Sequence, residues 1–418
     1  MVVFVRLADI TPRIWNVPKI CAEQVVSDAC QGACWQQDSA PPLAMRILVA
    51  PDKFKGSLTA ASAAAAIARG FRSALEDSDI GLAPIADGGE GFSQALHAAL
   101  AGEWVTTRAC DPLGREVEAR YAWIADSRLA VIEMSEASGL WRLLPHEREP
   151  LRATTFGTGQ LIRHAAERGA KTILVGLGGS ATTDGGIGMA KALGYEFLTS
   201  DGEDLEAIPE LLLALTRIVA EKAIDLPEIV AACDVQNPLL GPRGTARVFS
   251  PQKGADAQTV ETLELCMQNL ADVVKQDLGC DFSDAPGAGA AGGIGYGLMT
   301  FCGAKVRSGF DVVAEAIQLE ARIAAADLVI TGEGRLDDQT LDGKGPAGVA
   351  AMARKHGKPV IAFAGSASNH PSLATLFDAV CPIVDQTIGL EEAMGRGEEL
   401  LERAAARAAR LIVLGRLL

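Results

Sequence analysis

TILVGLGGSATTDGGIGMAKALGY, residues 172–195, carries the clearest structural signal in this chain. Its first part, Thr172–Leu177, is an apolar run rich in β-branched residues, which predicts a buried strand. The glycine-rich segment Gly178–Gly186 follows, and a helical pattern covers Ile187–Leu193. Strand, glycine loop and helix together can form an anion site, because glycines let the backbone approach a phosphate and the N–H groups of the helix start face it.

The side chains of this loop favour phosphate binding over a tight turn that merely joins a strand to a helix. Three hydroxyl groups and one carboxylate stand among the glycines, and hydroxyls can add to the backbone N–H groups as phosphate ligands. The loop lacks the Gly-Lys-Ser/Thr end of a Walker A motif, and its loose G-x-G-x-x-A match lies too far from the helix for a dinucleotide fingerprint. The predicted ATP-binding residues are Gly178, Gly179, Ser180, Thr182 and Thr183.

Composition is typical of a globular protein and argues against two classes of partner. A length of 418 residues indicates two or three domains, and a hydrophobic content of 49% is ample for buried cores. The net charge of −15 argues against nucleic acid and anionic membranes, since both need a basic surface on the protein. Because cations are few, lysines and arginines beside the glycine loops become candidates for binding an anionic substrate.

Cysteine usage and hydropathy predict a cytoplasmic protein. The nine cysteines are odd in number and form no C-x-x-C pair, which is typical of reduced thiols. No apolar run reaches the ~18–20 residues of a membrane span. Residues 1–44 show neither periodicity nor the layout of a signal peptide, so we expect a disordered or mis-annotated extension outside the fold.

Beyond this extension, short apolar runs alternate with helical ones, and the alternation predicts a parallel, doubly wound α/β sheet. Arg46–Ala50 is the first such strand, and Thr59 is a suitable N-cap for the next helix. From Trp104 three short strands joined by turn residues predict an antiparallel meander. We therefore expect a discontinuous Rossmann-like or flavodoxin-like domain, residues 45–103 plus 298–418, with a mixed α/β domain, residues 104–297, inserted into it.

Charged or glycine-rich loops follow the carboxyl ends of five predicted strands, where open parallel sheets bind their ligands. Phosphoryl transfer needs cations on the moving phosphate, carboxylates for Mg²⁺ and a base for the attacking hydroxyl, and these loops supply all three. The predicted catalytic residues are Asp87, Asp184 and Lys55; the predicted substrate-binding residues are Lys53, Ser57, Glu333 and Arg335; and the predicted Mg²⁺ ligands are Asp184 and Asp337.

These assignments have structural alternatives. Asp87 and Asp184 each precede a glycine, so they also fit Asp-Gly turns, and Lys53 and Lys55 also fit a solvated surface. The five histidines fit surface or core positions better than catalytic ones. A second glycine-rich stretch, 287–297, contains G-x-G-x-x-G but follows no strand, so it lacks the context of a dinucleotide site and is equally compatible with a crossing between domains.

Six ordered motifs resemble those of the glycerate kinase family of bacterial glyoxylate and sugar-acid catabolism. They cover the chain from Met45 to near its C-terminus, whereas residues 1–44 fall outside the resemblance. At position 183 some members of the family have Asn, and this chain has Thr. The motifs are APDKFKGSLTA (50–60), ADGGEG (86–91), TTFGTGQLI (154–162), GLGGSATTDGGIGM (176–189), CDVQNPLLGPRGTA (233–246) and TGEGRLDDQT (331–340).

The resemblance implies ATP-dependent phosphorylation of D-glycerate by two α/β domains, one of them of flavodoxin type, with the active site in the cleft. The expected cofactors are ATP and Mg²⁺. The motifs do not tell whether the product is 2-phosphoglycerate or 3-phosphoglycerate, and they carry no information on oligomeric state. The alternatives are a kinase of another small hydroxy acid, a non-catalytic nucleotide- or solute-binding protein, and a dehydrogenase. The number of acids in the loops argues against pure binding, and the incomplete fingerprints argue against a dehydrogenase.

Overall fold

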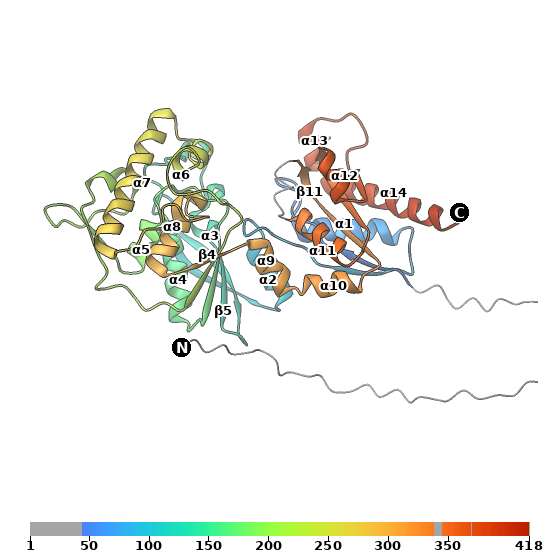
Figure 1. Ribbon diagram of the computed structural model, residues 1–418, viewed down its shortest axis with the longest axis horizontal. Coiled ribbons are helices and arrows are strands. Elements are labelled where there is room, and N and C mark those ends of the chain that lie inside the picture. The colour runs from blue at the N-terminus through green and yellow to red at the C-terminus, as the bar shows by residue number, and fades with distance from the viewer. Residues whose placement is uncertain (1–43, 338–344, 369, 418) are drawn as a thin grey trace, which may run out of the picture. The chain divides into compact units, whose positions relative to one another are not determined.

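The computed structural model describes residues 44–337, 345–368 and 370–417, and these belong to one compact unit. They form a five-stranded sheet, a six-stranded sheet and a two-stranded ribbon, with helices packed on the sheets (Figure 1). Within this described part, no helix is both long and apolar enough to cross a membrane. The prediction for residues 1–44 falls almost entirely outside the described residues.

The five-stranded sheet is entirely parallel and has the flavodoxin-like strand order. Numbered along the chain, its strands lie in the order 2-1-3-4-5, which is that of flavodoxin rather than of a Rossmann fold. Its first two strands come from one end of the chain and its last three from the other, so the sheet is discontinuous in sequence. The strands are β1 (Arg46–Val49), β2 (Asp79–Leu82), β11 (Leu328–Leu336), β12 (Val360–Ala367) and β13 (Ala379–Pro382).

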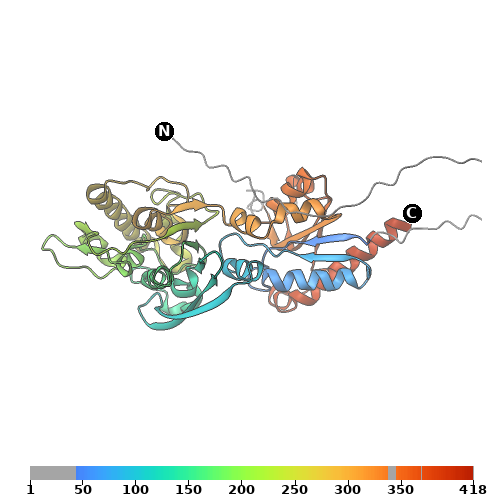
Figure 2. The ribbon, with the colours of Figure 1, turned by 90° about the horizontal axis from the view of Figure 1, so that it is seen from below.

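Two long helices cover one face of the parallel sheet, as Figure 2 shows in blue and red. They are α1 (Ala60–Arg72) and α14 (Gly397–Leu417). The predicted cap is confirmed, because the side chain of Thr59 accepts a hydrogen bond from Ser62 N at 3.1 Å. The helices cross closely at Gly70, where a Cβ would lie 2.4 Å from the backbone oxygen of Glu402. The short α13 (Leu390–Gly395) leads into α14.

The six-stranded sheet is mixed and contains the predicted meander. The first three strands pair antiparallel, and the next three continue the sheet with parallel pairing. In sheet order from one edge, the strands are β10 (Lys305–Arg307), β9 (Glu228–Ala232), β6 (Thr172–Gly176), β5 (Leu129–Glu133), β4 (Glu116–Ile124) and β3 (Glu103–Cys110). A separate antiparallel ribbon pairs β7 (Glu196–Leu198) with β8 (Arg217–Val219).

One face of the mixed sheet supports a large apolar core under a group of helices. The longest of them has its N-cap at Asp256 and its C-cap at Gly279, whose left-handed conformation with φ +67° stops the helix. These helices are α3 (Ser135–Ser138), α4 (Phe156–Glu167), α5 (Ile187–Ala192), α6 (Thr245–Phe249), α7 (Ala257–Leu278) and α8 (Ala290–Cys302).

A second apolar cluster connects the two sheets. It contains Leu48 and Val329 from the parallel sheet, Val131 and Leu174 from the mixed sheet, and residues such as Phe310 from the helices between them. Burial of this continuous cluster stabilises the contact between the sheets by the hydrophobic effect. The helices of this layer are α2 (Phe92–Ala99), α9 (Gly309–Ala316), α10 (Leu319–Ala325), α11 (Pro346–Lys355) and α12 (Pro371–Leu376).

One local expectation differs from the structure, and a second glycine-rich stretch finds its place in it. Strand β11 continues to Leu336, because its pairing with β12 extends to Leu336 opposite Ala367; Glu333 and Arg335 therefore lie on a strand and not on a loop. The second glycine-rich stretch is packed at the start of α8, where Gly292 has φ +83° and a Cβ would lie 1.8 Å from Thr182 O. The division into domains at residues 104 and 297 stays a prediction, and β10 of the mixed sheet lies beyond residue 297.

Candidate active site

The loop after β1 runs beside the end of β11, at the point where the strand order of the parallel sheet reverses. Asp52 N donates to Gly332 O at 2.8 Å, and Thr331 Oγ1 donates to Ala50 O at 2.8 Å. A Cβ on Gly334 would lie 3.2 Å from Lys55 N. In doubly wound sheets this reversal point is where ligands bind, so the fold brings the lysine loop to the expected place.

Lys53, which follows β1, and Asp87, which follows β2, form an ion pair near this reversal point. Lys53 Nζ lies 3.0 Å from Asp87 Oδ1, and Gly89 N donates to the same oxygen at 3.1 Å. Burial alone would raise the pKa of Asp87, but Lys53 and the Gly89 N–H outweigh it and the pKa is lowered. The Asp87 side chain keeps 40% of its surface exposed, so it is an ionised carboxylate with access to a ligand.

Asp52, next to this pair, is a site candidate that the sequence analysis passed over. It is buried, and burial together with the charges of Asp87 and Asp234 raises its pKa to about 6, against the opposing effect of Lys53. Asp234, at the end of β9, accepts hydrogen bonds from the N–H groups of Gly309 and Phe310 at the start of α9. The signal available in the sequence was the position of Asp52 directly after the first strand.

The segment that carries Asp87 packs against the ends of β6 and β9 with no room for side chains. A Cβ on Gly88 would lie 2.7 Å from Ala232 O, and a Cβ on Gly178 would lie 2.5 Å from the Cα of Gly89. Both distances are shorter than real Cβ contacts, which explains glycine at both positions. The structure thus brings the predicted residues Lys53, Asp87 and Gly178 together, although they come from different sheets.

Glu133, at the end of β5, holds this segment from the other side. Its buried carboxylate accepts hydrogen bonds from Ser93 N at 2.8 Å and Ser93 Oγ at 2.9 Å, at the start of α2. Burial raises the pKa of Glu133, and these hydrogen bonds partly offset the rise. Glu133 therefore positions the Asp87 segment and was another residue missed by the sequence analysis.

The backbone of the glycine loop presents N–H groups at its first turn. Gly179 is exposed with φ +66°, and no described residue accepts a hydrogen bond from the N–H of Gly178, Gly179 or Ser180. Three successive N–H groups without a described acceptor are suited to bind an anion. The backbone of this turn, rather than its side chains, matches the predicted phosphate site.

The hydroxyl groups of the loop are turned inward. Ser180, Thr182 and Thr183 are all buried. Ser180 Oγ lies 2.9 Å from Thr182 Oγ1 and accepts from Thr182 N at 3.0 Å, while Thr183 Oγ1 lies 3.1 Å from Ser250 Oγ. In this geometry the hydroxyls hold the shape of the loop, and direct contact of these side chains with ATP stays a prediction.

Asp184 is fully enclosed. Its carboxylate accepts hydrogen bonds from the N–H and hydroxyl of Thr155 at 2.8 and 2.7 Å, and from the N–H groups of Gly186 and Gly188. Burial raises its pKa, and these four donors work against the rise. A carboxylate with no exposed surface and four donors fits the role of holding a loop, so the geometry weighs against Asp184 as base or Mg²⁺ ligand.

Lys253 lies directly behind the same loop and did not stand out in the sequence. Its side chain is buried, and Nζ donates to Thr182 O and to Ser180 Oγ. Burial lowers its pKa to about 7, although the charge of Asp184 raises it in part. A lysine between Gln252 and Gly254 carries no sequence pattern that distinguishes it from a surface lysine.

The other predicted residues lie around the reversal point and differ from one another in exposure and in bonding partners. Ser57 Oγ donates to Met394 O at 2.6 Å, which ties the loop to the segment before α14 and gives Ser57 a structural use. Lys55 is exposed and forms no ion pair with the described part of the chain. Arg335 is exposed and lies 3.0 Å from Asp337, and Glu333 is half-buried. No group of three or more potential metal-ligating side chains occurs among the described residues.

The model of the glycerate kinase family matches residues 47–413. The chain belongs to this family. It is 44% identical over 366 residues to the glycerate kinase of Halalkalibacterium halodurans, covering 86% of this chain and 96% of the relative. It is 41% identical over 380 residues to the glycerate 2-kinase of Escherichia coli, covering 89% of this chain and 99% of the relative.

A solved structure supports the same membership. The crystal structure of putative glycerate kinase 2 from Salmonella typhimurium LT2 is similar with a TM-score of 0.79 and 43% sequence identity, covering 90% of this chain and 100% of that one. The family predicted from the six motifs is therefore confirmed, and so are the α/β fold class and the assignment of the chain as a phosphotransferase.

Proposed function

We propose that this chain transfers the γ-phosphoryl group of ATP to D-glycerate and forms 2-phosphoglycerate. Family membership and the named relatives support the glycerate kinase reaction. The E. coli relative, a glycerate 2-kinase at 41% identity, supports the 2-hydroxyl as the acceptor. The structural observation that carries the proposal is the Lys53–Asp87 pair beside the Gly178–Ser180 turn.

In the proposed reaction, a hydroxyl oxygen of glycerate attacks the γ-phosphorus, the bond from that phosphorus to the bridging oxygen breaks, and ADP leaves. The N–H groups of Gly178–Ser180 bind a phosphate of ATP. The exposed oxygen of Asp87 accepts the proton of the attacking hydroxyl, and Lys53 orients that carboxylate and offsets charge on the moving phosphoryl group.

Asp87 and Asp52 divide the acid–base work in this proposal. Asp87, whose pKa is lowered, stays ionised at neutral pH and is a weak but accessible base. Asp52 has a pKa of about 6 and is therefore protonated at a higher pH than Asp87. Its protonation state sets the electrostatic field at the Lys53–Asp87 ion pair. Activity should therefore fall as pH drops through about 6, because protonation of Asp52 changes the field at Lys53 and Asp87.

The exposed cations Lys55 and Arg335 are proposed to bind the carboxylate of glycerate, since they follow β1 and lie at the end of β11. Mg²⁺ in kinases takes one or two carboxylates together with phosphate oxygens and water. Asp337, with a quarter of its side chain exposed beside Arg335, fits this role better than the enclosed Asp184. When bound there, Mg²⁺ would offset the negative charge of the phosphates during transfer.

The test is ³¹P and ¹H NMR of the product from D-glycerate, ATP and Mg²⁺. Formation of 2-phosphoglycerate supports the proposal, and 3-phosphoglycerate overturns its regiochemistry alone. Parallel reactions with L-glycerate, glycolate and D-lactate test the alternative of another hydroxy acid. If any of these compounds is turned over faster than D-glycerate at equal concentration, that compound is the better candidate for the substrate.

A further inference from the structure

Lys253 is a buried lysine with only neutral hydrogen-bond partners. Its side chain is 2% exposed, and Nζ donates to the backbone oxygen of Thr182 and to Ser180 Oγ, 3.4 Å away. No carboxylate of the described residues forms an ion pair with it. Lysines are rarely buried to this extent without a counter-charge, because desolvation of the ammonium is costly.

The packing leaves Lys253 no route away from the loop. A Cβ on Gly292 would lie 1.8 Å from Thr182 O and 3.0 Å from Lys253 Nζ, so the start of α8 closes over both. A Cβ on Gly254 would lie 3.0 Å from Arg148 O, so the next residue is also enclosed. The amine is thus fixed behind the turn whose front carries the N–H groups of Gly178–Ser180.

We propose that Lys253 is a positioning residue for phosphoryl transfer, which holds the Ser180–Thr182 turn and supplies the positive charge that the bound phosphate needs. This rests on the proposed function, in which the front of the turn binds a phosphate of ATP. Lys253 acts through the turn and does not touch the ligand: its hydrogen bond to Thr182 O fixes the peptide, and its charge lies behind the N–H groups.

A charge in this place is effective because the surroundings are dry. Between buried groups the effective dielectric constant is well below that of water, so a phosphate on the front of the turn is the missing counter-charge of the ammonium. The titratable or charged groups that face Lys253 are Asp184 in the loop and Arg148, whose Nη1 donates to Gln252 O at 3.5 Å. Asp184 accepts its hydrogen bonds from Thr155, Gly186 and Gly188 and forms no ion pair with Lys253.

The lowered pKa of Lys253, about 7, agrees with this role. Without ligand at pH 8, roughly one tenth of the amines would carry a proton, whereas a bound phosphate favours the charged form. Binding of nucleotide should therefore take up protons at pH 8, where the phosphates of ATP and the carboxyl of Asp52 are already ionised.

The experiment is isothermal titration calorimetry with the β,γ-imido analogue of ATP and Mg²⁺ at pH 8, in Tris and in phosphate-free buffers of lower ionisation enthalpy. We expect the wild-type chain to take up ~0.5–0.9 proton per bound nucleotide. Lys253→Met should abolish this uptake and raise the KM for ATP ~10- to 100-fold, with the KM for glycerate within about twofold. Lys253→Arg, which keeps the charge, should recover part of the affinity. Lys305→Met, an exposed lysine paired with Glu228, is the matched control and should behave as wild type.

Each outcome separates this inference from the proposed function. A wild-type enzyme that makes phosphoglycerate but takes up no protons on binding overturns the inference alone, whether or not Lys253→Met folds. A folded Lys253→Met with an unchanged KM for ATP does the same. Absence of both nucleotide binding and phosphoglycerate formation in the wild type overturns the proposed function and the inference with it.

Discussion

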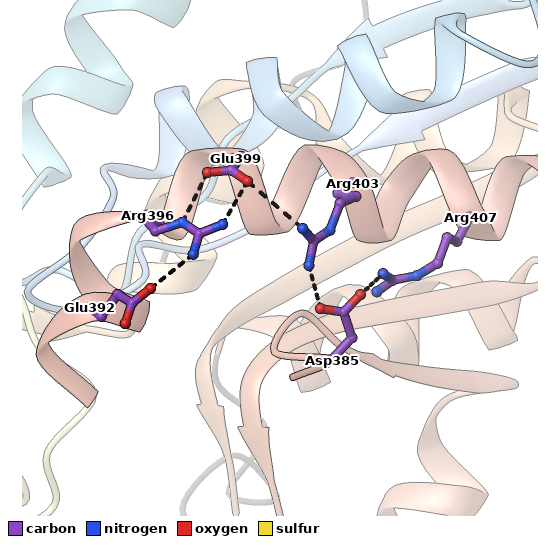
Figure 3. Close-up of polar contacts among 6 residues, drawn as sticks. All are labelled: Asp385, Glu392, Arg396, Glu399, Arg403 and Arg407. Atoms are coloured by element: carbon purple, nitrogen blue, oxygen red, sulfur yellow. Dashed lines mark hydrogen bonds and ion pairs between the residues drawn. The ribbon is translucent and has the colours of Figure 1, made fainter. Parts of the chain in front are cut away.

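Charged side chains form networks in two regions of this molecule, behind the glycine loop and along α14, and the two networks are built in opposite ways. At the start of α14, Arg396 pairs with Glu392 of α13 and with Glu399 at 2.9 Å, and Asp385 lies between Arg403 and Arg407 (Figure 3). All of these side chains are at least one third exposed. Each charge there has an opposite charge within reach, and water surrounds the whole group.

Behind the glycine loop the opposite holds. Asp184 and Lys253 are buried, and each is bonded to neutral donors or acceptors instead of to an opposite charge. Exposed ion pairs contribute little because water and salt screen them and their side chains lose entropy. The stability of a buried charge depends on every one of its hydrogen bonds, because water cannot take the place of a hydrogen-bond partner that is lost. The comparison teaches that the number of charge pairs does not measure the importance of a network, whereas burial does.

The largest effect is expected for a variant of the candidate active site, compared with a variant of the exposed charge network near α14. Asp87→Asn should lower kcat by ~10²–10⁴-fold with a small change in the KM for ATP, because the accessible base is lost. Asp385→Asn removes a carboxylate that pairs with two arginines on the α14 side and should leave kcat within about twofold of wild type. Steady-state kinetics of both variants decide the matter, and equal losses would contradict the comparison.

The second prediction concerns stability. Asp184→Asn places an amide NH₂ among four donors and leaves at least one buried N–H without an acceptor, so the free energy of unfolding should fall by about 1–3 kcal/mol per unmet group. Urea unfolding at pH 7 measures the change, and Glu399→Gln on α14 is the control, for which only a slight change is expected. If Asp184→Asn is as stable as wild type but inactive, Asp184 takes part in the chemistry after all.

The third prediction is a pH dependence of stability due to Lys253. Its pKa is about 7 in the folded chain against an ordinary value of 10.5, so between these pH values the unfolded chain holds a proton that the folded chain has lost. Stability of the wild type should therefore rise with pH in this window, by at most about 1.4 kcal/mol per pH unit, relative to Lys253→Met. Urea unfolding of both proteins from pH 7 to 9.5 measures the difference, and parallel curves would show that the buried lysine is not neutralised.

The smallest effect is expected for the network on α14. Arg396 lowers the pKa of Glu399 below its ordinary 4.5, so the stabilisation by this pair is present above that pH and is lost as the pH falls through the lower folded value. Acid unfolding of wild type and Glu399→Gln should converge once the pH has fallen through the lowered pKa of Glu399, and the two proteins should differ only slightly above it. A large difference in the free energy of unfolding at neutral pH that persists in high salt would show that this surface network stabilises the fold as much as the buried one.

Local sequence was sufficient for most of the elements and for part of the site. Period and turn residues predicted β1, α1, the meander β3–β5 and the strand–loop–helix unit around Gly178–Gly186, because these signals depend on residues close together in the chain. They also predicted that Lys53 and Asp87 follow strand ends, and the motifs predicted the family. Glu333 and Arg335 were predicted on a loop but lie on β11, because pairing with β12 extends that strand and local pattern does not reveal this partner.

Tertiary structure alone decided which of these side chains are accessible and which are enclosed. Asp87 and Asp184 look alike in sequence, each before a glycine, yet one carboxylate is open beside Lys53 and the other is enclosed by Thr155 and two glycine N–H groups. Lys253 looks like any surface lysine until α8 closes over it. Burial and hydrogen-bond partners come from segments distant in the chain, and these set the pKa and access of a side chain; residue type and spacing set only what that side chain is able to do.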